Sequence, residues 1–124
     1  MATQSTGFFT VETGTAVIAV RLRVFLANPE NAPYQTRVDV VKRRNGQVYE
    51  VVSEEVTIPA GATRVIEIDD VAGEDVQVTV DLPEREYPPQ SPVVPGVAVI
   101  SAFAPDDEVT LLHWISASDF APVS

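Results

Sequence analysis

Apolar and polar side chains alternate residue by residue along several stretches of this chain, and this period of two limits the fold more than any other feature. In residues 76–82, three valines and a leucine alternate with Gln, Thr and Asp, and residues 16–27 alternate in the same way. Successive side chains of a β-strand point to opposite faces, so this pattern is typical of half-buried strands. No stretch of useful length has helical periodicity. The chain is therefore expected to be all-β.

Turn residues separate these stretches at short intervals. In residues 56–68, Pro59 ends one strand because it cannot donate a ladder hydrogen bond, and Gly61 can take the positive φ that reverses the chain. Asn45-Gly46 is the strongest hairpin signal. Twenty-two valines favour strands throughout. The sequence predicts a single antiparallel β-sandwich of seven to eight strands, immunoglobulin-like or jelly-roll.

The chain divides into an N-terminal arm, residues 1–14, and a sandwich domain, residues 15–124. The length of 124 residues is typical of one domain. The arm holds one short apolar stretch, Phe8, Phe9 and Val11, with a glycine on each side. This stretch either pairs within its own sheet or adds a strand to another subunit.

Charge is unevenly distributed along the chain. The net charge is −10, which argues against nucleic acid as a partner. Residues 1–48 carry six basic and three acidic groups, so +3, whereas residues 49–124 carry two basic and fifteen acidic groups, so −13. The charges either only keep the protein soluble or let a basic edge meet the acidic edge of a neighbour. The candidate residues for that charged interface are Arg37, Lys42, Arg43 and Arg44.

No stretch forms a catalytic motif, and the chain is expected to be neither an enzyme nor a cofactor carrier. His113 is the only histidine, and there is no cysteine, so a zinc site is not expected. His113 lies beside Trp114 on the last long strand and is expected to be half-buried, without a nucleophile to activate. No apolar run approaches the length of a membrane span, so membrane insertion is not expected either.

Acidic residues gather at two turns. One turn contains Asp69, Asp70, Glu74 and Asp75, and the other spans residues 106–108. Calcium binds oxygen ligands from such loops, but neither cluster has the alternating order of a calcium loop. The sequence favours solvated turns, and calcium at the first cluster is the alternative.

The run from Ile58 to Thr63 and the position of Asn28 at the end of an early strand carry a resemblance to known modules. Over about residues 16–82 the chain resembles bacterial immunoglobulin-like modules of the CARDB type and jelly-roll modules. It is also similar to subunits of bacterial endospore appendages, which have an N-terminal connector. Those connectors rely on cysteines, which residues 1–14 lack, so covalent cross-linking is excluded. The sequence does not determine the compartment, and an extracellular, spore-surface or particle-associated location is favoured over a cytoplasmic one.

Two functions follow as hypotheses. The first is a non-enzymatic structural protein that self-associates into a filament or particle coat, with its N-terminal strand as the arm between subunits. The alternative is a binding module, which recognises carbohydrate or protein or decorates a phage particle. That module would use the loops at residues 28–33, 69–75 and 83–96.

Overall fold

The computed structural model describes residues 2–11, 17–69, 71, 73–83, 92–103 and 108–123. These residues form ten strands and one turn of 3-10 helix, η1 (Ala117–Asp119). The strands are β1 (Ala2–Ser5), β2 (Phe9–Thr10), β3 (Val17–Ala27), β4 (Tyr34–Arg44), β5 (Gln47–Ile58), β6 (Thr63–Ile68), β7 (Asp75–Leu82), β8 (Val94–Phe103), β9 (Glu108–Ile115) and β10 (Ala121–Pro122).

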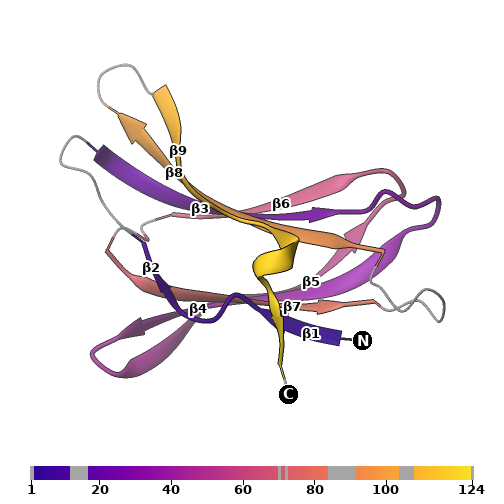
Figure 1. Ribbon diagram of the computed structural model, residues 1–124, viewed down its shortest axis with the longest axis horizontal. Coiled ribbons are helices and arrows are strands. Elements are labelled where there is room, and N and C mark those ends of the chain that lie inside the picture. The colour runs from indigo at the N-terminus through magenta and orange to yellow at the C-terminus, as the bar shows by residue number, and fades with distance from the viewer. Residues whose placement is uncertain are drawn as a thin grey trace.

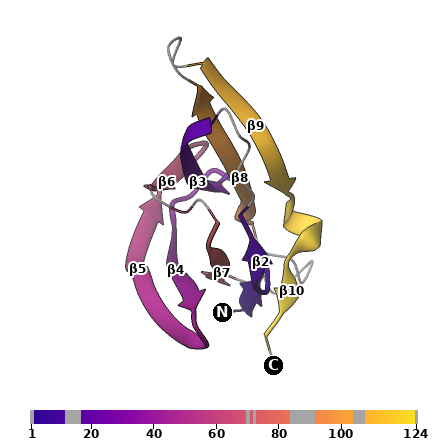
Figure 2. The same ribbon diagram turned by 90° about the vertical axis from the view of Figure 1, so that its left-hand side faces the viewer.

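The strands form two antiparallel sheets that pack face to face (Figure 1). Sheet A has the order β10-β1-β7-β4-β5, and β2 also pairs with β7. Sheet B has the order β6-β3-β8-β9. This arrangement confirms the predicted all-β sandwich. Figure 2 shows the layers from the side, with β5 and β9 at the margins of the molecule.

The predicted strand count of seven to eight is too low, because three short strands come from the ends of the chain. β1 and β2 pair with β7, and β10 pairs with β1. Strands of two to four residues are too short to show an alternation of apolar and polar residues in the sequence. β1 and β2 form because one edge of β7 is left open by β4, and β10 then adds to β1. The chain reaches β10 from sheet B through η1, which crosses between the layers (Figure 1).

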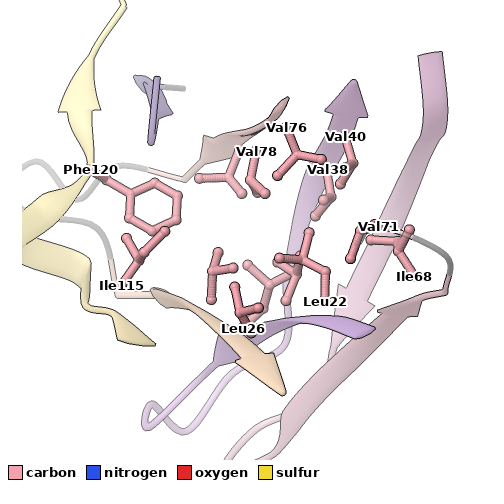
Figure 3. Close-up of a cluster of buried hydrophobic side chains, with 14 of the residues drawn as sticks. Leu22, Leu26, Val38, Val40, Ile68, Val71, Val76, Val78, Ile115 and Phe120 are labelled. Atoms are coloured by element: carbon pink, nitrogen blue, oxygen red, sulfur yellow. The ribbon is translucent and has the colours of Figure 1, made fainter. Parts of the chain in front are cut away.

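The core lies between the sheets and is built from the alternating positions. Val76, Val78, Val80 and Leu82 of β7 are all buried, as their spacing predicts. The buried residues of β3 face them from sheet B (Figure 3). Ile115 and Phe120 close the same core near the C-terminus. The sequence pattern thus decides which face of each long strand is buried.

Both predicted turns have the backbone that their residues favour. Asn45 and Gly46 have φ values of 54° and 78°, so both central positions of the β4–β5 hairpin are left-handed. Gly61 has a φ of 71° and reverses the chain between β5 and β6. Asn28, at the end of β3, is buried beside this second turn.

Candidate functional site

The N-terminal segment, which the sequence offers as an arm between subunits, pairs with its own chain. β1 is hydrogen-bonded to β7 from Ala2 opposite Leu82 to Ser5 opposite Thr79. β2 continues along the same strand, with Phe9 opposite Val76. This is the first of the two alternatives that the sequence leaves open. A role for the segment between subunits stays a prediction.

The three apolar side chains of this segment have different surroundings. Val11 is buried in the core, and Phe9 packs against the core from the inner face of sheet A. The Phe8 ring lies under the guanidinium of Arg43, 4.3 Å from the ring centroid. All three are therefore in contact with their own chain.

His113 lies closer to solvent than the sequence predicts. Its ring centroid is 6.4 Å from that of Phe9, but the residue is exposed rather than half-buried. A β-bulge between Val99 and Ile100 shifts the β8–β9 register just at this point. A bulge turns the following side chains and breaks simple alternation. Leu111 and Ile115 would share one face in a regular strand, but across the bulge they point to opposite faces, and Leu111 is exposed whereas Ile115 is buried.

The basic residues of the β4–β5 hairpin meet acidic residues of the same chain. Arg43 reaches Asp75 at 3.4 Å, and Arg44 forms an ion pair with Glu74. Both acids lie at the start of β7, which pairs with the end of β4.

The other two members of the predicted charged interface lie on the same strand. Arg37 pairs with Asp39 at 3.4 Å and donates a hydrogen bond to Ser53 Oγ at 2.5 Å. Lys42 is half-buried on β4. The ion pairs of these three arginines described above are thus made within one chain, and a use of this strand between chains stays a prediction.

The first acidic cluster does not converge on a common point. Asp69 pairs with Arg21 on sheet B at 3.1 Å, whereas Glu74 and Asp75 pair with arginines of β4. Asp70 lies outside the described residues, as do residues 106 and 107 of the second cluster. Within the described part of the chain, no three His, Cys, Asp or Glu side chains lie close enough together to hold a metal ion.

Asp75 connects three strands, and its pKa departs from the usual value. Thr10 Oγ1 of β2 donates to its carboxylate at 2.6 Å, and Arg43 of β4 approaches the other oxygen. The Thr10 hydrogen bond, followed by the hydrogen bond and charge of Arg43, lowers the pKa of Asp75 below its usual 3.8, although desolvation acts in the opposite direction. A carboxylate with a lowered pKa stabilises the fold above its unfolded-state pKa, and this contribution disappears as the pH falls through the folded-state value.

We therefore expect Asp75→Asn to lower the unfolding temperature at pH 7 and to flatten its decline below pH 4. Circular dichroism melts between pH 2 and pH 7 measure both effects. Glu50→Gln, an exposed change on β5, serves as the control and should leave the profile unchanged. A parallel downward shift of the Asp75→Asn melts at every pH would show that ionisation of Asp75 is not the cause.

The three loops proposed for recognition do not gather at one end of the sandwich. Ala27 and Val94 are register partners, so the loop at residues 28–33 and the end of the segment at 83–96 lie at the same end of sheet B. Residues 84–91 are outside the described residues. Ile68 pairs with Leu22 and leads away from that end, so the loop at 69–75 begins at the opposite one. The described residues of the three loops therefore do not share one end of the sandwich, and a recognition role for any of the loops stays a prediction.

Most of the large exposed apolar side chains in the described part of the chain belong to two groups that the sequence patterns did not indicate. The β5 group consists of Val48, Tyr49 and Val51 on the edge strand of sheet A. The sheet B patch lies on the outer face of sheet B and comprises the exposed residues Val65, Val94, Leu111 and Trp114 with the half-buried Phe25. One sequence signal could have indicated the patch. Gly96 lies inside a strand, and a glycine in such a position often marks the close approach of another group, here the indole of Trp114.

Comparison with family models, with curated proteins and with solved structures finds no match for this chain. Of the residues that the structure describes, none belongs to a helix long and apolar enough to cross a membrane.

Proposed function

We propose that this chain is a non-enzymatic structural protein that self-associates, as a subunit of a filament or particle coat. The observation that supports this most is the amount of large apolar side chain left exposed on a strongly acidic chain. Trp114 is 48% exposed, Leu111 57% and Val65 49%. Scattered single residues of this kind are normal, but neighbouring ones mark interaction surfaces.

Two long edge strands add to this support. Among the described strands, β5 ends sheet A and β9 ends sheet B, with twelve and eight residues respectively. An edge strand presents unpaired backbone N–H and C=O groups that another chain can pair with. Glu50, Glu54 and Glu55 on β5 disfavour pairing of two β5 edges by charge repulsion. Growth through a head-to-tail contact would produce a fibre, whereas a two-fold contact would close.

Light scattering behind a sizing column tests this proposal. We expect the mean mass to rise above 13.4 kDa as the protein concentration increases from about 1 µM to about 1 mM, a range that spans weak and moderate association. Electron microscopy of the most concentrated sample separates closed oligomers from fibres. A mass of one chain over the whole range would overturn the proposal.

A further inference from the structure

The six-membered ring of the Trp114 indole approaches Gly96 closely, because the neighbouring strand has no side chain at that position. A Cβ built at Gly96 would lie 2.7 Å from Cη2 and 3.0 Å from Cζ2 of the indole. The indole also meets Phe25 on the far side of Gly96, with ring centroids 5.9 Å apart and planes at 54°. Trp114 of β9 thus reaches across β8 to a residue of β3, and the ring packs against sheet B although the residue is 48% exposed.

Around this indole the outer face of sheet B is mostly apolar. Val65 is the register partner of Phe25, and Ala98 is the register partner of Trp114. Residues paired in this way point to the same face. Val94 and Leu111 lie on that face too, by the registers of β3 with β8 and of β8 with β9. The patch therefore extends over all four strands of the sheet.

The charged residues of this face cancel one another. Arg23 lies 3.1 Å from Glu67, and Arg21 lies 3.1 Å from Asp69 and 3.6 Å from Glu67. Two cations and two carboxylates give this face a net charge of zero among the described residues, on a chain whose total is −10.

The outer face of sheet A differs. By the same register argument, the described residues of that face include two arginines and five carboxylates, which gives it a net negative charge. They are Arg37 and Arg43 against Asp39, Glu50, Glu55, Asp75 and Asp81. Like charges placed together oppose association, so two copies would meet at sheet B at lower electrostatic cost than at sheet A.

We propose that a second copy of this chain docks on the outer face of sheet B, sheet against sheet, with Trp114 as the main anchor. This inference rests on the proposed self-association and names one of its contact surfaces. Two sheet B faces form a two-fold contact that closes as a dimer, so a filament or coat needs a second contact on each dimer. Aromatic side chains held in one position are typical anchors of interfaces, because little conformational freedom is lost when they are covered. Charge favours a second copy at this face over a second copy at sheet A, since the outer face of sheet B is neutral among the described residues, whereas that of sheet A carries five carboxylates and two arginines.

The area of the outer face of sheet B limits the expected affinity between two copies. Four strands about 4.8 Å apart and about eight residues long at about 3.4 Å each give a flat area of roughly 500 Å². Stable complexes bury about 800 Å² on each partner, so a dissociation constant in the micromolar range is expected. Salt should strengthen the contact, because the contact is apolar and salt screens the repulsion between the two acidic copies.

Sedimentation equilibrium of the wild type and three variants tests whether the outer face of sheet B is the contact surface. Trp114→Ala removes the anchor. Gly96→Ala displaces the indole through its added Cβ, and the backbone can accept alanine because Gly96 does not have a positive φ. Tyr49→Ala, which removes an equally exposed aromatic ring from β5, is the matched control. We expect both sheet B variants to raise the dissociation constant at least tenfold and Tyr49→Ala to change it less than twofold. Melting curves identify any variant that fails to fold, and Leu111→Ser on the same face then replaces it.

The outcomes separate this inference from the proposed function. A wild-type chain that stays monomeric overturns both. An assembly that survives Trp114→Ala, Gly96→Ala and Leu111→Ser but is lost in Tyr49→Ala overturns only the sheet B contact and leaves self-association in place. A tryptophan emission shift that appears in monomeric protein when a soluble polysaccharide is added would assign the face to carbohydrate and also overturn the inference.

Discussion

Replacement of Asn28 by alanine is expected to lower the free energy of unfolding by about 3 kcal/mol, since several buried polar groups lose a partner together. The Asn28 side chain is 1% exposed, and its Nδ2 donates to the carbonyl oxygens of Ala32, Ile58 and Pro59 at 2.8, 3.0 and 3.2 Å. Its Oδ1 accepts from the backbone N–H of Glu30 at 3.1 Å. One side chain thus fixes the loop after β3 to the turn between β5 and β6.

Urea unfolding measures this effect, and two variants serve as controls. Asn31→Ala changes an exposed residue of the same loop and should cost less than about 0.5 kcal/mol. Asn28→Asp keeps the acceptor for Glu30 but turns an oxygen toward three carbonyl oxygens. We expect it to be at least as destabilising as alanine at pH 7 and to recover partly in acid, where a protonated carboxyl can donate again. A loss below about 1 kcal/mol for Asn28→Ala would show that water replaces the amide.

The long strands and their buried faces could be predicted from the sequence because each rule involved is local. Alternation over residues 76–82 needs only the pleat of one strand, and Asn45-Gly46 needs only its own φ values. Asn28 could be placed at the end of its strand in the same way. Its buried hydrogen bonds to Ile58 and Pro59 could not, because they join segments about thirty residues apart.

The charge asymmetry shows why the functional prediction was harder. A basic first part and an acidic remainder suggest two edges that meet between molecules. The fold pairs β3 with β6 and β4 with β7, so Arg23 meets Glu67 and Arg43 meets Asp75 within one chain, and a charged contact between molecules stays a prediction. Charge along a sequence becomes a surface property only after strand pairing is known, and the neutral face of sheet B is a product of that pairing.

Removal of residues 2–11 is expected to destabilise the sandwich by roughly 4 kcal/mol, which is a large part of the 5–15 kcal/mol that holds a domain together. Val11 is 1% exposed and Phe9 is half-buried, and burial of one such side chain is worth about 1.5–3 kcal/mol. The deletion also frees the edge of β7 and removes the partner of β10. Urea unfolding at several protein concentrations measures the loss. An unchanged midpoint would show that the segment does not pair with β7.

A peptide of residues 1–11 then decides whether the segment acts within one chain or between chains. We expect the peptide to raise the melting temperature of the deletion variant, because it fills the vacated edge of β7 and stabilises the fold by mass action. A peptide with Phe9→Ser and Val11→Asp should have no effect, since Val11 enters the core.

The same peptide, added in excess to the full-length protein, should leave the mass of its assemblies unchanged if each β7 edge is filled by its own chain. Assemblies that dissociate under the peptide would mean that neighbouring chains supply the strand, and the N-terminal segment would then be an arm after all. Assemblies that resist the peptide but dissociate in Trp114→Ala would place the contact on sheet B.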